Sequence, residues 1–263
     1  MTNPARTLSA QQAIDLWLQV PRRPISAAMR RTLEAAEGGH FTFGDLDLPL
    51  SSWGQPGNPF VLLVHGWGGH RGQLSAIGAA LAAAGYRATA FDAPAHGDVP
   101  GEQTNGYEIA QVIKGLVAEL GQPYAVVAHS LGTMSTTIAL QEGLRAQRLV
   151  YTGPMRRLHD AMGAFLQMHN LAEEVAHQVE SAMLDRFGDD VWEVTALDLQ
   201  LPGIGLPTLL IHDKQDEVTP YVSSLALKRA YPDAELLSTE GLGHRKILRD
   251  PAVIQRIMEF IQG

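Results

Sequence analysis

The chain has 263 residues, of which 45% are apolar and 18% are charged, a composition typical of folded globular proteins rather than disordered ones. Its 28 acidic and 20 basic residues give a formal net charge of −8, which argues against a nucleic-acid partner. The chain has no cysteine, so disulfides, thiolate nucleophiles and cysteine-ligated metals are excluded.

The first 20 residues lack the basic region and following apolar run of a secretory signal. Apolar stretches elsewhere, such as residues 79–84, are far shorter than the roughly 20 residues that a membrane-spanning helix needs. From these two observations we expect a cytoplasmic protein with no membrane partner.

Two helices and a hairpin are predicted before residue 54. Ser9 is the expected N-cap of a helix over residues 10–20. Pro24 can open a second short helix, which we expect to end near residues 38–39. Over residues 40–53 the apolar residues alternate with polar ones, and this pattern predicts a β-hairpin.

From residue 60 onward, short apolar runs alternate with helical patterns. The expected strands cover residues 60–64, 87–91, 124–128, 148–151, 208–212 and 235–238. The expected helices cover residues 76–85, 107–120, 131–142, 222–231 and 253–261. Strands that are apolar throughout and separated by helices predict an α/β fold, with a mostly parallel central sheet and helices on both of its faces.

Residues 155–200 interrupt this rhythm, because they are patterned as helices and contain half of the eight methionines. We interpret them as a helical cap inserted over the strand ends, where open α/β sheets bind ligands. A pair of helices that merely extends the core is the alternative. The predicted organisation is an N-terminal helical segment at 1–39, a core at 40–154 and 201–263, and the cap insertion at 155–200.

The strongest chemical signal is Ser130 in the sequence Ala-His-Ser-Leu-Gly, between a predicted apolar strand and a predicted helix. The small residues Ala128 and Gly132 flank it at two positions on either side. This pattern is typical of a nucleophile elbow, in which a strained turn exposes the serine and small neighbours let strand and helix approach. The alternative is that Ser130 is only a helix N-cap.

Three further segments follow predicted strands. The first is the glycine-rich sequence His-Gly-Trp-Gly-Gly at 65–69, whose backbone N–H groups are suited to bind an oxyanion. The second contains Asp216 and stands just before Val-Thr-Pro, with Asp213 and Glu217 as neighbouring carboxylates. The third places His244 in a loop between glycines and a basic run.

With these motifs, and with Phe-Asp-Ala-Pro-Ala-His-Gly at 91–97, the chain resembles the α/β-hydrolase superfamily over residues 40–263. The order serine, acid, histidine is the order of that superfamily. The resemblance implies that Ser130 is the nucleophile, His244 the general base and then acid, and Asp216 the orienting carboxylate. It also implies that the backbone N–H groups of Trp67 and Leu131 form the oxyanion hole.

Two features qualify the resemblance. Ala95 stands where the family commonly has glycine, in a loop outside the triad. Spacing alone does not separate Asp216 from Asp213 or Glu217, and Asp216 is favoured because the family places the acid shortly before an apolar-x-Pro step.

The function we expect is a carboxylic ester hydrolase that needs no cofactor or metal. It would act on small-molecule esters or thioesters with small-to-medium apolar acyl groups, through an acyl-enzyme on Ser130. A thioesterase, lactonase, carbon–carbon bond hydrolase or perhydrolase would use the same triad. A non-catalytic ligand-binding protein and a metal-dependent hydrolase are the alternatives from other classes, and the oligomeric state is left open.

Overall fold

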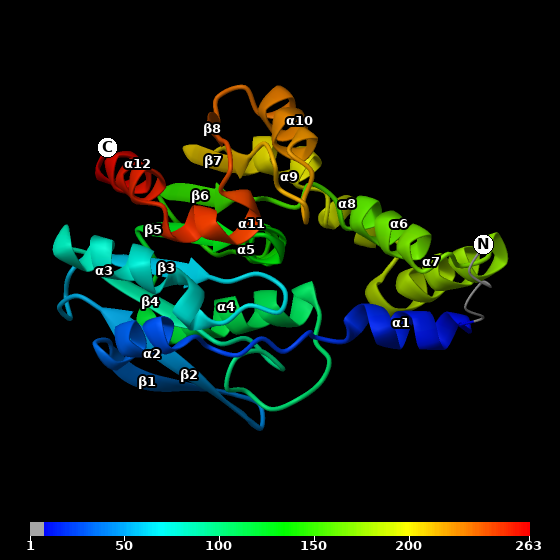
Figure 1. Cartoon of the computed structure of the whole chain (residues 1–263), viewed down its shortest axis with the longest axis horizontal. Helices are drawn as coiled ribbons and strands as arrows, with labels where there is room; N and C mark the ends of the chain where they lie inside the picture. Colours follow the sequence, from blue (N-terminus) through cyan, green and yellow to red (C-terminus); the bar gives the residue numbers. More distant parts are fainter. Residues whose placement is uncertain (1–7) are drawn as a thin grey trace.

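The computed structural model describes residues 8–263 and is built around one eight-stranded sheet (Figure 1). The strand order across the sheet is β1-β2-β4-β3-β5-β6-β7-β8. The strands are β1 Glu37–Phe43, β2 Leu46–Trp53, β3 Phe60–Val64, β4 Arg87–Phe91, β5 Ala125–His129, β6 Arg148–Thr152, β7 Thr208–Asp213 and β8 Glu235–Thr239. The β1–β2 hairpin and the β2–β4 pair are antiparallel, and all pairs from β4 to β8 are parallel. The predicted α/β fold with a mostly parallel sheet is confirmed.

Alternate residues of the central strands enter two separate hydrophobic clusters, one on each face of the sheet. In β3, Leu62 and Val64 belong to one cluster, whereas Val61 and Leu63 belong to the other. Helices α4 Gly106–Leu120 and α5 Leu131–Gln141 cover the first face, while α3 Ser75–Ala83 and α12 Pro251–Gln262 cover the second. Because both faces are buried, the central strands are apolar throughout, as the sequence pattern requires.

The N-terminal segment forms two helices that lie apart. Helix α1 Ala10–Leu18 starts with a capping box, in which Ser9 and Gln12 bond each other's backbone N–H groups. Helix α2 Ala27–Glu34 is capped by Ser26 and packs near the core helix α3. We expected this second helix to end near residues 38–39. That expectation was wrong, because the chain already pairs as β1 from Glu37.

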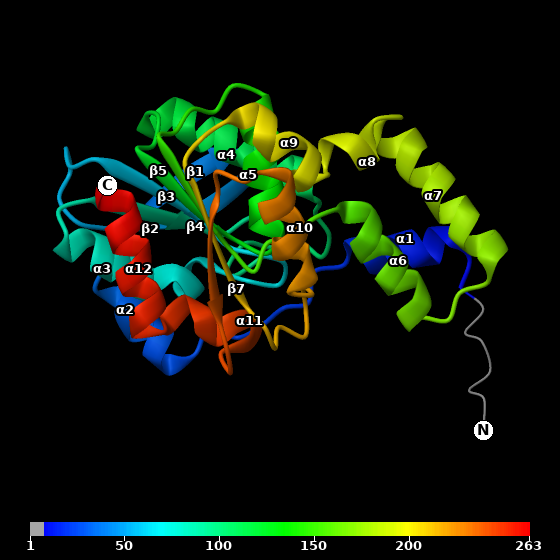
Figure 2. The same ribbon diagram turned by 90° about the horizontal axis from the view of Figure 1, so that it is seen from above.

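Between β6 and β7 the chain forms four helices rather than a strand. They are α6 Leu158–Met168, α7 Glu173–Phe187, α8 Val191–Val194 and α9 Leu197–Ile204. Helices α6, α7 and α8 extend to one side of the sheet, and α1 lies alongside them (Figure 2). The indole of Trp17 on α1 meets the ring of Phe165 on α6 edge to face, with centroids 5.2 Å apart. The N-terminal helix and this segment therefore share one apolar core.

Two methionines of this segment, Met162 and Met183, are buried in its apolar core. Met168 is 79% exposed, and Met155 is partly buried. Met162 and Met183 thus fill the packing between helices rather than line an open surface. No helix within residues 8–263 is both long and apolar enough to cross a membrane.

Candidate active site

Ser130 occupies the turn between β5 and α5. Its φ of +52° and ψ of −123° are an unfavourable backbone conformation for any residue other than glycine. The turn is held by the Ser130 N–H, which donates to the Thr152 carbonyl of β6 at 3.0 Å. At Gly132 a Cβ atom would lie 2.5 Å from the His65 carbonyl oxygen, so only glycine lets α5 approach β3 this closely. The local geometry is that of the elbow that the sequence predicts.

The glycine-rich loop after β3 packs directly on Ser130. A Cβ atom at Gly66 would lie 2.7 Å from the Ser130 Cβ. His65 holds the loop in place through two hydrogen bonds. Its Nδ1–H donates to the Gly66 carbonyl at 2.8 Å, and its Nε2 accepts from the Ala93 N–H at 3.1 Å. Within residues 8–263, no hydrogen bond uses the N–H of Trp67 or the N–H of Leu131.

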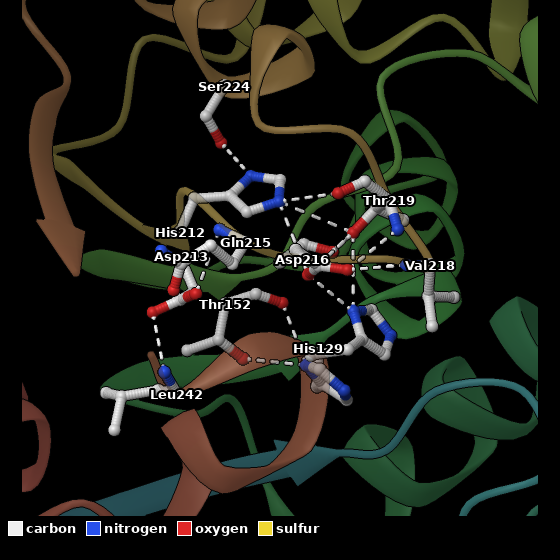
Figure 3. A network of polar contacts seen from close by, with 12 residues as sticks. His129, Thr152, His212, Asp213, Gln215, Asp216, Val218, Thr219, Ser224 and Leu242 are labelled. Carbon is white, nitrogen blue, oxygen red and sulfur yellow. Dashed lines mark hydrogen bonds and ion pairs between the residues drawn. The ribbon is translucent and has the colours of Figure 1, made fainter. Parts of the chain in front are cut away.

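The Asp216 carboxylate accepts several hydrogen bonds in the loop after β7 (Figure 3). Its side chain is 1% exposed. The N–H groups of Val218 and Thr219 donate to Oδ1 at 2.8 and 2.9 Å, and the Thr219 hydroxyl donates to Oδ2 at 3.1 Å. Burial raises the pKa of Asp216, but hydrogen bonds from His212, His244 and Thr219 outweigh it and hold this pKa well below its usual range. The carboxylate is therefore ionised across the physiological pH range.

His244 lies between Asp216 and the Ser130 turn. Its Nδ1 is 2.7 Å from Asp216 Oδ2, and its ring centroid is 4.5 Å from that of His129, the residue before Ser130. Gly153 borders the pair, because a Cβ atom there would lie 3.2 Å from His244 Nδ1. The hydrogen bonds of the described residues include none between Ser130 and His244. In enzymes without a bound substrate such catalytic hydrogen bonds are often long, and they tighten in the substrate complex.

The other two carboxylates near Asp216 have different surroundings. Asp213 is buried and accepts hydrogen bonds from the Thr239 hydroxyl at 2.8 Å and from the Leu242 N–H at 3.0 Å. It therefore ties the loop that carries His244 to the end of β7. Glu217 is exposed to solvent. Of the three, Asp216 is the carboxylate that the structure brings to His244.

Several histidines around the site are neutral at ordinary pH. Burial lowers the pKa of His65 to about 4 and that of His129 and of His96 to about 3. The ring of His129 also has a fixed partner, because its Nδ1 donates to the Thr152 carbonyl at 2.9 Å. The imidazole that lies against His244 on this side is therefore uncharged. Within residues 8–263, no group of three or more His, Asp or Glu side chains is arranged to hold a metal ion.

Sequence reasoning missed His212, a buried neighbour of Asp216. Its Nε2 donates to the Thr219 carbonyl at 2.9 Å and lies 3.4 Å from Asp216 Oδ2, while its Nδ1 accepts from the Ser224 hydroxyl at 2.7 Å. These partners fix both the tautomer and the ring orientation. His212 is the last residue but one of β7, and only this position, four residues before Asp216, signals its role.

Sequence comparison places most of the chain in one family. A model of the alpha/beta hydrolase family matches residues 61–255, which is more than two thirds of the chain. No curated protein sequence matches the chain. The match excludes the N-terminal helices and the first hairpin, and it spans all the residues discussed in this site.

Solved structures with the same fold have names that refer to different activities. A serine hydrolase from Cycloclasticus zankles is 18% identical with a TM-score of 0.67, covering 86% of this chain and 98% of its own. The thioesterase domain of the curacin biosynthetic pathway is 20% identical with a TM-score of 0.64, covering 86% and 99%. An epoxide hydrolase from Vigna radiata is 20% identical with a TM-score of 0.62, covering 88% and 99%. These structural similarities establish the fold. They do not identify the reaction, which has to be inferred from the residues of the site.

Proposed function

Since the chain belongs to the alpha/beta hydrolase family, we propose that it is a serine hydrolase acting on carboxylic esters, without a cofactor or a metal. The observation that carries the proposal is the 2.7 Å hydrogen bond between His244 and Asp216, beside a serine in a strained elbow. A histidine oriented by a buried carboxylate is the arrangement that activates a serine hydroxyl.

In the first half of the reaction, the Ser130 hydroxyl gives its proton to His244 Nε2 while its oxygen attacks the ester carbonyl carbon. The carbonyl π electrons move onto oxygen, and the N–H groups of Trp67 and Leu131 bind the resulting oxyanion. Both groups have no other hydrogen-bond partner within residues 8–263. The oxyanion then collapses, the bond to the alcohol oxygen breaks, and His244 returns its proton to the leaving alcohol.

In the second half, His244 takes a proton from water, whose oxygen attacks the acyl carbon on Ser130. The second tetrahedral oxyanion collapses, the acid is released and the proton returns to the Ser130 oxygen. Asp216 stays ionised throughout and stabilises the imidazolium that forms in each half. The low pKa of Asp216 supports this role, because a carboxylate that took up the proton would not balance the charge on His244.

For the acyl group we propose a small-to-medium apolar chain. The side chains of Trp67 and Leu131, the residues whose N–H groups we assign to the oxyanion, are apolar and partly exposed, and so is that of Met155. Met155 is two residues beyond Gly153, which borders His244. The cap role of residues 155–200 stays a prediction, and the buried Met162 and Met183 contribute nothing to an acyl site.

A panel of p-nitrophenyl esters tests the proposal. Hydrolysis of the butyrate and hexanoate esters is expected to exceed that of an ester with a carboxylate at the end of its acyl chain. The Ser130→Ala variant should fold and lose the activity. Full activity in Ser130→Ala would exclude Ser130 as the nucleophile, and faster hydrolysis of the charged acyl ester would exclude the apolar acyl site.

A further inference from the structure

The side chain of Thr219 lies beside the carboxylate of Asp216 (Figure 3). Its Oγ1 atom is 3.1 Å from Asp216 Oδ2 and 3.3 Å from His244 Nδ1. The same oxygen is 3.2 Å from the carbonyl oxygen of Gly153, the residue that follows β6. One hydroxyl group therefore contacts the carboxylate, the imidazole and the end of the neighbouring strand.

The backbone of Thr219 is anchored at both of its polar groups. Its N–H donates to Asp216 Oδ1 at 2.9 Å, and its carbonyl accepts from His212 Nε2 at 2.9 Å. Pro220 follows directly, and its ring fixes its own φ angle. Thr219 is 7% exposed. The hydroxyl is thus held among its protein partners rather than turned toward solvent.

The partners of this hydroxyl match what a hydroxyl can offer, which is one proton and two lone pairs. The Asp216 carboxylate and the Gly153 carbonyl can only accept, and they lie at similar distances of 3.1 and 3.2 Å. His244 Nδ1 carries a proton, because it lies 2.7 Å from the ionised Asp216. The Thr219 oxygen can therefore accept from His244 while its own proton bonds either acceptor. It keeps these partners whether the imidazole carries one proton or two.

The orientation of the His244 ring depends on few contacts. Within residues 8–263, its hydrogen-bond partners are Asp216 Oδ2 and Thr219 Oγ1. The ring of His129 packs against it with centroids 4.5 Å apart, but makes no hydrogen bond to it. A single bond to one oxygen lets an imidazole rotate about that bond, whereas a second partner limits the rotation.

We propose that Thr219 is a positioning residue of the site. Its hydroxyl holds the Asp216 carboxylate and the His244 ring in one relative orientation. In that orientation His244 Nε2 can take up the proton of Ser130. This inference rests on the proposed function and adds a residue that aligns the acid and the base without touching the reacting atoms. Its loss should therefore lower turnover rather than substrate binding.

Two substitutions separate the hydroxyl from the rest of the side chain. Thr219→Val keeps the branched shape and the backbone bonds, whereas Thr219→Ser keeps the hydroxyl and loses a methyl group. With p-nitrophenyl butyrate we expect kcat to fall by about 10- to 100-fold in Thr219→Val, with KM within about twofold. The fall in Thr219→Ser should be less than about threefold. Thr219→Ala, which adds no methyl group in place of the hydroxyl, should behave as Thr219→Val does.

Thr208→Val is the matched control for the loss of a buried hydroxyl. Thr208 is 2% exposed, and its hydroxyl donates to the Leu206 carbonyl at 2.7 Å. It begins β7, whereas Thr219 follows the other end of that strand. The control should lower the urea midpoint and keep kcat, with circular dichroism showing that each variant is folded. A fall in kcat that is as large in Thr208→Val or in Thr219→Ser as in Thr219→Val would overturn the inference.

Proton NMR separates this inference from the proposed function, because it needs no turnover. In the Ser130→Ala protein with isotope-labelled histidine, the proton on His244 Nδ1 is assigned by its loss in His244→Asn. We expect Thr219→Val to exchange this proton with water about tenfold faster or more, and Thr219→Ser to preserve the slow exchange. If no ester is hydrolysed and the exchange responds in this way, the proposed function fails alone. An unchanged exchange rate in folded Thr219→Val would overturn the inference, and so would an unchanged kcat in an active enzyme.

Discussion

The Nδ1 atom of His244 and the Oδ2 atom of Asp216 lie 2.7 Å apart, although the two residues are separated by 28 positions in the chain and belong to two different loops. The loops meet because β7 and β8 are adjacent and parallel, so that their carboxyl ends lie at the same edge of the sheet. Asp213 adds a second connection by binding the Leu242 N–H. The pair is thus a product of the topology of the sheet.

Replacing Asp216 by asparagine tests the role of this pair. The variant keeps the size of the side chain but removes the charge that stabilises a protonated His244. We expect kcat for p-nitrophenyl butyrate to fall by about 10³–10⁴ with little change in the far-ultraviolet circular dichroism spectrum.

The matched control is Glu217→Gln, at the exposed neighbouring carboxylate, which should keep kcat within about twofold. A larger loss in Glu217→Gln than in Asp216→Asn would transfer the acid role to Glu217.

The contact between Gly66 and Ser130 predicts the effect of one methyl group. In Gly66→Ala the new Cβ would lie 2.7 Å from the Ser130 Cβ, so the loop must move. We expect stability to fall by about 1–3 kcal/mol, and kcat by about 10², because the oxyanion donors shift with the loop. Urea denaturation and ester kinetics measure the two effects.

Gly163→Ala serves as the control, because Gly163 lies inside α6 with nothing within 4 Å of a new Cβ. Higher helix propensity should raise the stability of that variant by up to about 1 kcal/mol. An unchanged kcat in Gly66→Ala would argue against the packing of the loop on the elbow.

The backbone conformation of Ser130 predicts that the serine needed for activity makes the folded protein less stable than a glycine at the same position would. With φ at +52° and ψ at −123°, a glycine would relieve strain that both serine and alanine must bear. We expect Ser130→Gly to be more stable than Ser130→Ala by about 1 kcal/mol, after the greater freedom of glycine in the unfolded chain is included. Equal urea midpoints for the two variants would mean that the turn is not strained.

Buried neutral histidines predict a loss of stability in acid. The pKa values of His65, His96 and His129 lie at about 3 to 4 in the folded state, whereas an unfolded histidine has a pKa near 6.5. As the pH falls from about 6.5 to about 4, only the unfolded chain takes up these protons, so the free energy of unfolding decreases. Each histidine contributes up to about 1.4 kcal/mol per pH unit in this window.

Urea denaturation at pH 7, 6 and 5 measures this slope. Replacement of His129 by asparagine should make the slope shallower by up to about 1.4 kcal/mol per pH unit, whatever it does to the stability at pH 7. A slope that does not change in that variant would show that His129 takes up its proton in the folded protein too.

Much of the fold could be predicted from the sequence because its strongest signals are local. Apolar runs such as Phe60–Val64 mark buried parallel strands, and the small residues around Ser130 mark the elbow. The predicted end of the second helix was wrong because Glu37 pairs with strand β2 and therefore belongs to β1. The confirmed expectations concern the family and the fold, while the roles of Ser130, Asp216 and His244 stay predictions.

Some contacts were beyond the reach of the sequence alone. His212 on β7 reaches Asp216, four residues later, because of the conformation of the turn after the strand. Pro21 and Arg23 reach Gly68 through the path of the chain outside the family region. No spacing rule connects residue 23 with residue 68. Ala95 could be singled out from the sequence, but the reason for its position could not. Its positive φ of 62° explains why the family commonly has glycine there.

The central claim is that His244 and Asp216 activate Ser130, and covalent labelling tests it most directly. Intact-mass spectrometry after treatment with a fluorophosphonate, followed by peptide mapping, should show one adduct per chain on Ser130. The adduct should be absent from Ser130→Ala and form much more slowly on Asp216→Asn. A folded wild-type protein that gains no adduct, or gains it at another residue, would contradict the account.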